Sequence, residues 1–251
     1  MPRRGPPRGR QDPVRYWLIK TFLAIPLLHL FFRIEVHGRE HLPTRGPGVI
    51  ASNHLSTIDS VFVPLVIPRH VTYLAKSQFT TGKGLGAWFR RELMTALGQL
   101  AIDRSGGSAS AAGIAAGAGV LQRGELLGIY PEGTRSPDGR LYRGRTGVAR
   151  ILVEAPAPVI PVGVFGTPEI MPKGAKFPRL GRRVIIVFGP PLDFSRYAGV
   201  GEDRFVLRAI TDEIVHEISK LSGQEYVDVY ASSVRPSREA RTDSAVPESA
   251  A

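Results

Sequence analysis

Residues 49–60 read Val-Ile-Ala-Ser-Asn-His-Leu-Ser-Thr-Ile-Asp-Ser, and they contain a strand end, a histidine and an aspartate. The apolar residues 49–51 predict a short buried strand, and residues 52–53 predict the turn that ends it. His54 and Asp59 follow, directly before an apolar run that predicts a helix. The order of strand, polar turn and helix predicts an α/β domain.

The spacing of His54 and Asp59 restricts where the two side chains can meet. On one regular helix, five residues turn two side chains about 140° apart, so they could not face each other. They can meet if His54 lies in the loop before the helix and Asp59 in its first turns. A carboxylate so placed can hold one imidazole nitrogen while the other takes a proton from a substrate. The chain has six histidines and nine aspartates, so such a pair also arises by chance.

The composition narrows the classes of partner and chemistry. The 251 residues carry a net charge of +11, which indicates an anionic partner such as membrane lipid, nucleic acid or a phosphorylated substrate. Nucleic acid is not expected as a partner, because the aromatic and basic residues are not interleaved and no nucleic-acid-binding motif occurs. Zero cysteines exclude disulfides, thiolate catalysis and cysteine-bound metal, and they fit a reducing compartment.

The two ends of the chain differ in composition from its middle. Residues 1–15 hold five arginines and one aspartate among Pro and Gly, which predicts a flexible basic arm. Residues 16–33 are strongly apolar, and as a straight helix residues 16–32 would span roughly 26 Å, short of a bilayer core. We expect this helical segment to enter one leaflet of an anionic membrane; a helix packed on the domain is the alternative. Residues 223–251 are predicted to form a largely disordered tail.

Residues 34–222 alternate between strand and helix patterns. Strands are predicted at 34–37, 48–51, 71–75, 99–102, 126–130, 159–164 and 183–188. Helices are predicted at 60–67, 84–97, 108–122, 144–154 and 202–221. Short apolar strands that alternate with helices predict one three-layer α/β/α domain.

Three further stretches lie where predicted strands begin or end. Asp103 and Arg104 follow a strand and precede a glycine turn, residues 130–136 read Tyr-Pro-Glu-Gly-Thr-Arg-Ser, and residues 157–163 form a rigid apolar stretch. In an open α/β sheet, ligands bind beyond the carboxyl ends of the strands, so these groups and His54 could converge there.

These stretches would suit a phosphate, although each has a plain structural interpretation. Arg104 and Arg135, together with the backbone N–H groups of Gly133 and Thr134, are donors of the kind that bind phosphate. Taken singly, the Asp103-Arg104 pair also fits a solvated surface pair, and residues 130–136 fit an ordinary turn.

In combination, four ordered blocks resemble the lysophospholipid acyltransferase family, which contains the 1-acyl-sn-glycerol-3-phosphate acyltransferases. The blocks are Asn53-His54-x4-Asp59, Ile102-Asp103-Arg104, Tyr130-Pro-Glu-Gly-Thr-Arg-Ser136 and Val159-Ile160-Pro161-Val162. The resemblance covers roughly residues 34–222, and a membrane-associating segment before the domain is typical of the family. Two departures stand out: Lys76-Ser77-Gln78 replaces a common Lys-x-Glu, and Ala101 replaces a common proline.

The resemblance implies a reaction and a role for each residue. A fatty acyl group would pass from acyl-CoA or acyl-ACP to the sn-2 hydroxyl of 1-acyl-sn-glycerol-3-phosphate, giving phosphatidic acid. His54 would be the general base and Asp59 its partner. Contacts to the phosphate and glycerol of the acceptor would come from Arg104, Glu132, Gly133, Thr134, Arg135 and Lys76. Support would come from Asn53, Asp103 and Pro161.

The remaining expectations concern cofactors, location and alternatives. No metal or cofactor is expected, because no ligand cluster with metal spacing occurs. The resemblance implies a glycerolphosphate-acyltransferase-like fold on the cytoplasmic face of the cell membrane, as a monotopic or peripheral protein. The alternatives are another lysophospholipid or a lyso-amino-lipid as acceptor, a thioesterase, or a non-catalytic membrane-binding protein. A lipase is not expected, because no Gly-x-Ser-x-Gly occurs.

Overall fold

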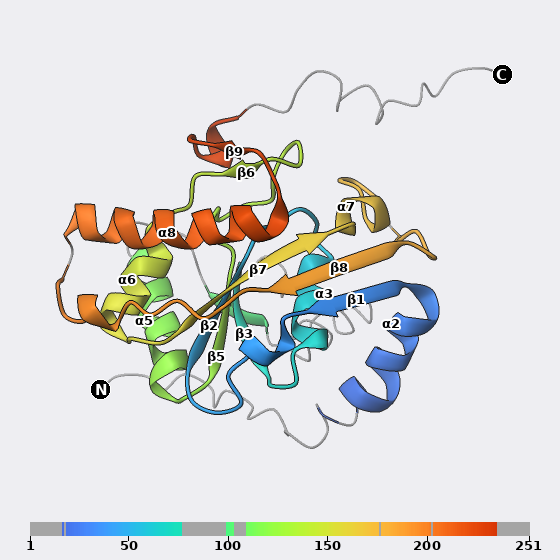
Figure 1. Cartoon of the computed structure of the whole chain (residues 1–251), viewed down its shortest axis with the longest axis horizontal. Helices are drawn as coiled ribbons and strands as arrows, with labels where there is room; N and C mark the ends of the chain where they lie inside the picture. Colours follow the sequence, from blue (N-terminus) through green and yellow to red (C-terminus); the bar gives the residue numbers. More distant parts are fainter. Residues whose placement is uncertain are drawn as a thin grey trace, which may run out of the picture.

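A seven-stranded sheet with the strand order β1-β8-β7-β2-β5-β3-β4 forms the centre of the molecule (Figure 1). The computed structural model describes residue 17 and residues 19–76, 99–102, 109–175, 177–201 and 203–234. The strands are β1 (Arg33–His37), β2 (Gly48–Ser52), β3 (Val71–Lys76), β4 (Gln99–Ile102), β5 (Leu126–Ile129), β7 (Val159–Phe165) and β8 (Arg183–Phe188). All seven predicted strands are therefore present. Neighbouring strands are parallel except for β7 and β8, which are antiparallel.

The central strand β2 shows why the sheet has helices on both faces. All five of its residues are buried, between β5 on one side and β7 on the other. Successive side chains of a strand point to opposite faces. Accordingly, Val49 and Ala51 belong to one apolar cluster of the core and Ile50 belongs to a second one. A continuous apolar run of this kind is stable only in a sheet that is covered twice.

The helices form the two outer layers. The cluster that contains Val49 also includes residues of α5 (Ala109–Gln122), α6 (Gly147–Glu154) and α8 (Arg204–Ser222). The cluster that contains Ile50 includes residues of α3 (Asp59–Val66). This arrangement confirms the three-layer α/β/α fold.

Helix α8 follows its sequence signals closely. Asp203 caps its start, since the carboxylate accepts hydrogen bonds from the backbone N–H groups of Phe205 and Val206. Gly223 ends it in a left-handed conformation with φ of 60°. The apolar stripe of the helix packs on the sheet through Leu207, Ile210, Ile214, Val215 and Ile218.

The predicted start of the tail at residue 223 is wrong. Strand β9 (Tyr226–Val227) pairs with β6 (Leu141–Tyr142), and a 3-10 turn, η5 (Ala231–Ser233), follows. The backbone N–H of Arg143 also donates to the carbonyls of this segment. Strands of two residues that pair across a long stretch of chain leave no local pattern, which explains the error.

Other short elements were also not predicted. They are α7 (Thr167–Ile170) and the 3-10 turns η2 (Arg39–His41) and η4 (Ser195–Tyr197), each about one turn long. The predicted helix at 84–97, the basic arm at 1–15 and residues 235–251 lie outside the described residues.

The segment before β1 is helical, as predicted, and packs on the domain along one side. It consists of a π-helix, η1 (Ile19–Ala24), followed by α2 (Ile25–Phe31). Lys20 is 3% exposed, and its Nζ donates to the carbonyls of Pro64 (2.8 Å) and Ile67 (2.5 Å) at the end of α3. A cation at that end of a helix is favourable, while burial lowers the pKa of Lys20 to about 8.

The opposite side of this segment is apolar and exposed. Phe22, Leu27, Leu30 and Phe31 all present their side chains to solvent. Within the described part of the chain, no helix combines the length and the apolar character needed to cross a membrane.

Candidate active site

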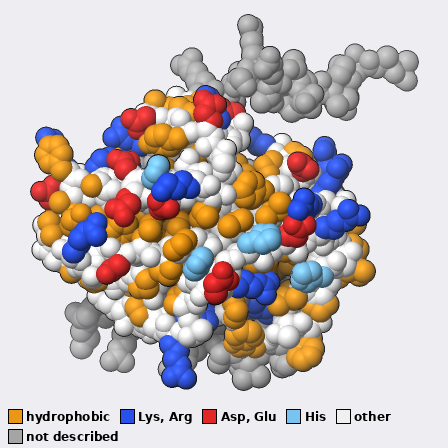
Figure 2. All heavy atoms as spheres, viewed as in Figure 1, with side chains coloured by type: hydrophobic (Ala, Val, Ile, Leu, Met, Phe, Trp, Pro, Cys, Tyr) orange, Lys and Arg blue, Asp and Glu red, His pale blue; other side chains and the backbone are white. Residues whose placement is uncertain are grey.

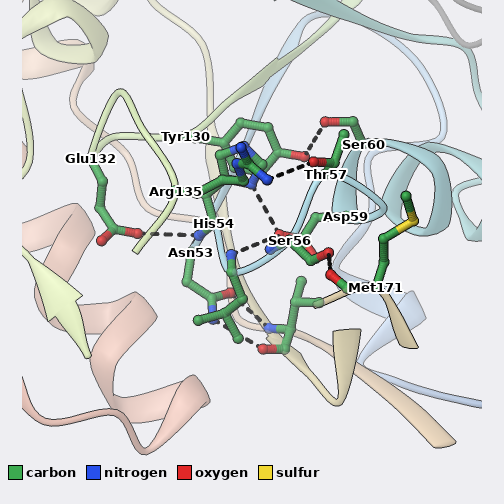
Figure 3. Close-up of polar contacts among 12 residues, drawn as sticks. Asn53, His54, Ser56, Thr57, Asp59, Ser60, Tyr130, Glu132, Arg135 and Met171 are labelled. Atoms are coloured by element: carbon green, nitrogen blue, oxygen red, sulfur yellow. Dashed lines mark hydrogen bonds and ion pairs between the residues drawn. The ribbon is translucent and has the colours of Figure 1, made fainter. Parts of the chain in front are cut away.

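His54 and Asp59 lie as their spacing requires. Residues 53–58 form the loop between β2 and α3, and Asp59 is the first residue of α3. His54 Nδ1 lies 3.0 Å from Asp59 Oδ2 (Figure 3). The pair therefore sits at the carboxyl end of the central strand, the edge where ligands bind in sheets of this type.

Asp59 is fully buried, and its carboxylate fixes the backbone of the loop at residues 53–58 through hydrogen bonds. Its Oδ2 also accepts hydrogen bonds from the backbone N–H groups of Leu55 (2.7 Å) and Ser56 (2.8 Å). An ionised carboxylate oxygen only accepts, so the proton of the neutral imidazole must be on Nδ1. His54 Nε2 is thereby left as the basic nitrogen, on a side chain that remains 15% exposed.

Tyr130 fixes the plane of the imidazole. Its ring is stacked on the ring of His54, with centroids 3.9 Å apart and planes inclined by 12°. Its hydroxyl forms a hydrogen bond with Ser60 Oγ at 3.1 Å, and the ring of Tyr73 lies behind it. Gly128 makes room for this stack, because a Cβ there would lie 2.3 Å from the ring of Tyr73. Tyr130 was not predicted as a site residue. The available signal was its place directly after β5, inside the third block.

Glu132 lies behind His54 instead of facing a substrate. The residue is 1% exposed, Oε1 accepts from the backbone N–H of His54 (3.1 Å) and Oε2 from that of Tyr142 (3.0 Å). A group that contacts glycerol must be reachable, so this burial corrects the role predicted for Glu132. The carboxylate joins the loop of His54 to β6. Burial raises its pKa to about 7, although both backbone hydrogen bonds lower it.

This pKa predicts a pH-dependent stability. Because the pKa of Glu132 is raised from 4.5 to about 7 in the folded chain, the folded state retains a proton there that the unfolded state releases. The resulting stabilisation is complete below about pH 4.5 and is lost as the pH rises through about 7. Relative to Glu132→Gln, which does not titrate, the wild type is expected to lose about 2 to 3 kcal/mol of unfolding free energy between about pH 5 and about pH 8. Urea unfolding of both proteins at the two pH values measures this, and a constant difference would contradict it.

The side chain of Arg135 contacts the loop that holds His54, whereas the N–H of Gly133 is taken up within its own turn. Arg135 Nη1 donates to Thr57 Oγ1 (2.8 Å), and the backbone N–H of Ser136 donates to the carbonyl of His54 (2.7 Å). Gly133 has φ of 73°, and its N–H donates to the carbonyl of Tyr130. The predicted phosphate contact of that N–H is therefore not supported. Thr134 and Arg135 remain exposed.

Asn53 and Pro161 both lie where β2 and β7 pair, beside His54. The buried amide of Asn53 accepts from Val164 N–H (2.8 Å) and donates to the carbonyl of Val164 (3.0 Å), which ties the end of β2 to β7. Pro161 stands opposite Ala51 in the same pair of strands. Asn53 Nδ2 also donates to Gln224 Oε1 (2.7 Å). Gln224, which follows α8, was not predicted because it belongs to no motif in the sequence.

The structure does not describe the side chains of three predicted site residues. Asp103 and Arg104 lie outside the described residues, and only the backbone of Lys76, the last residue of β3, is described. Among the described residues, there is no cluster of three or more His, Asp or Glu side chains that could bind a metal ion.

The chain is similar in sequence to known acyltransferases. A family model described as Acyltransferase matches residues 33–165, which is more than half of the chain. The chain belongs to the acyltransferase family. Together with the relatives named below, this match confirms the resemblance to lysophospholipid acyltransferases.

Several relatives have more specific names. The chain is 26% identical over 201 residues to the 1-acyl-sn-glycerol-3-phosphate acyltransferase of Bacillus subtilis, covering 79% of this chain and 92% of that protein. It is 29% identical over 147 residues to the sheep (Ovis aries) 1-acyl-sn-glycerol-3-phosphate acyltransferase alpha, covering 56% of this chain but only 49% of the relative. The chain thus spans about half the length of most curated relatives it matches.

A solved structure has the same fold. The PlsC 1-acyl-sn-glycerophosphate (LPA) acyltransferase of Thermotoga maritima superposes with a TM-score of 0.61 at 22% identity, covering 84% of each chain. At this identity the likeness supports the α/β/α fold and its sheet.

Proposed function

We propose that this acyltransferase moves a fatty acyl group from acyl-CoA or acyl-ACP to the sn-2 hydroxyl of 1-acyl-sn-glycerol-3-phosphate, which gives phosphatidic acid. The observation that carries the proposal is the hydrogen bond of His54 to the buried Asp59, 3.0 Å long, at the carboxyl edge of the sheet. The names of the relatives support the choice of acceptor.

In the proposed reaction, His54 acts as a general base. Nε2 takes the proton of the acceptor hydroxyl while its oxygen attacks the thioester carbonyl. Asp59 holds the tautomer and stabilises the imidazolium that forms, and the stacked ring of Tyr130 also favours that cation. When the tetrahedral intermediate collapses, the C–S bond breaks and the thiolate takes the proton from His54. No acyl-enzyme forms, because the acceptor oxygen is itself the nucleophile.

The acceptor phosphate is assigned to basic groups around this loop. The guanidinium of Arg135 lies beside Thr57 in the catalytic loop and is exposed, so it is reachable by a phosphate. Arg104 and Lys76 are added on the family resemblance. The net charge of +11 favours an anionic substrate and an anionic membrane alike.

The helical segment before β1 is assigned to a membrane. Phe22 and Leu30 are exposed on the side that faces away from the domain, and burying apolar side chains in a leaflet is favourable. We place the enzyme on the cytoplasmic face of the cell membrane, as a monotopic or peripheral protein, since its acceptor and product are membrane lipids.

The test supplies the purified chain, in detergent micelles, with 1-acyl-sn-glycerol-3-phosphate and a labelled acyl-CoA or acyl-ACP. Labelled phosphatidic acid is expected with at least one of the donors. A panel of other lysophospholipids and lyso-amino-lipids offered under the same conditions tests the acceptor. Labelled free fatty acid in place of phosphatidic acid would contradict the proposal and indicate a thioesterase.

A further inference from the structure

The loop between α7 and β8 is both basic and apolar. Residues 171–182 read Met-Pro-Lys-Gly-Ala-Lys-Phe-Pro-Arg-Leu-Gly-Arg and contain four cationic side chains. Phe177 is 81% exposed, more than any other large apolar side chain among the described residues, and Leu180 is 56% exposed. Apolar side chains of this size are seldom left in water without a partner when they lie together.

This loop is joined to the exposed side of α2. The backbone N–H of Gly181 donates to the carbonyl of Phe31 (2.7 Å), and that of Arg33 donates to the carbonyl of Arg182 (3.0 Å). The end of α2 and the start of β8 consequently lie at the same end of the molecule (Figure 1). Two segments that are distant in sequence thus lie side by side, and both present apolar side chains to solvent.

Most of the charges around this surface are positive. Lys173, Arg179 and Arg182 are exposed on the loop, and Arg33 is exposed at the start of β1. Arg183, at the start of β8, is neutralised by an ion pair with Glu35 of β1. Figure 2 shows several Lys and Arg side chains, with a few Asp and Glu side chains among them, at the right-hand edge of the visible face, over the start of β8. An apolar centre with a cationic border matches a leaflet whose headgroups are anionic.

The loop also begins beside the catalytic pair. Ser56 Oγ donates to the carbonyl of Met171 at 2.7 Å, and the N–H of the same Ser56 donates to Asp59 (Figure 3). A membrane bound by this loop would therefore lie close to the loop that holds His54 and Asp59, because Ser56 connects the two.

We propose that residues 171–182 form a second membrane-contact element, in which Phe177 and Leu180 enter one leaflet and the neighbouring cations contact anionic headgroups. The element extends the apolar side of α2 and rests on the proposed function, because the bilayer is the source of the acceptor. An acidic carrier protein would match the cations, but it would not explain the apolar side chains that continue onto α2.

The test measures binding of the full chain to vesicles of phosphatidylcholine with or without phosphatidylglycerol. The partition coefficient of the double variant Phe177→Ser/Leu180→Ser onto the anionic vesicles is expected to be lower than that of the wild type by a factor of about ten or more. Phe205→Ser is the matched control, because Phe205 is 72% exposed at the start of α8 and belongs to neither segment. The control is expected to bind like the wild type.

Binding does not require turnover, so this result is independent of the proposed reaction. If the wild type fails to make phosphatidic acid in micelles, the reaction is refuted while the vesicle result still decides the role of the loop. Equal binding of the double variant and the wild type would overturn the membrane element. The double variant Arg179→Gln/Arg182→Gln gives a second test. If it bound vesicles like the wild type and slowed acyl transfer only from acyl-ACP, the membrane element would also be overturned, because the loop would then bind the carrier protein.

Discussion

Replacing His54 by alanine is expected to lower kcat for phosphatidic acid synthesis by about a thousandfold, within the range typical of a lost general base. The proton of the acceptor hydroxyl would then have no imidazole to accept it. KM for the acceptor is expected to change little, because the exposed cation of Arg135 is retained. Initial rates with lysophosphatidic acid and labelled acyl-CoA, or acyl-ACP if that is the donor used, measure both constants.

The control for this variant is His37→Ala. His37 is exposed on β1, and its replacement is expected to leave the rate as in the wild type. A thermal melt of His54→Ala checks that the chain still folds. If the folded variant kept the rate of the wild type, the general-base mechanism would be refuted.

Replacing Asp59 is expected to have the second large effect on kcat. Two different substitutions separate the role of its negative charge from the role of its hydrogen bonds. In Asp59→Asn, the amide oxygen can still accept from the three N–H donors that now converge on Oδ2. The fold and the tautomer of His54 are therefore expected to survive. The negative charge that stabilises the imidazolium is lost, so kcat is expected to fall about a hundredfold, with KM nearly unchanged.

Asp59→Ala is expected to behave differently. It leaves the backbone N–H groups of Leu55 and Ser56 without their buried acceptor, at a cost of about 1–3 kcal/mol for each unsatisfied donor. Both activity and stability should then fall. Unfolding free energies and kcat for the two variants, with Asp212→Asn on α8 as the exposed control, distinguish the roles. A fully active Asp59→Asn would show that the charge of Asp59 is not needed.

Much of the fold was predictable because its signals are local. The buried run of β2 and the apolar stripe of α8 both arise within one element, where periodicity alone indicates the burial. The contact between His54 and Asp59 was predictable for the same reason, since only a loop-to-helix arrangement lets residues at that spacing meet.

The roles of single residues in the third block were not predictable in this way. Glu132 looks like an exposed turn residue in the sequence, but its carboxylate accepts from His54, which is distant in the chain, and from Tyr142. The N–H of Gly133, by contrast, donates to the carbonyl of Tyr130 within the same turn. The partners of the Glu132 carboxylate depend on how separate segments pack, and no local pattern records that.

The sequence by itself thus determined the α/β/α class, the order of the four motif blocks and the arrangement in which His54 can meet Asp59. Each of these depends on the periodicity or spacing of residues close together in the chain. Only the tertiary structure decided that Tyr130 stacks on His54, that Gln224 contacts Asn53 and that the loop at Phe177 adjoins α2. Those contacts join distant segments, and their geometry is set by the packing of the whole sheet and its two helical layers.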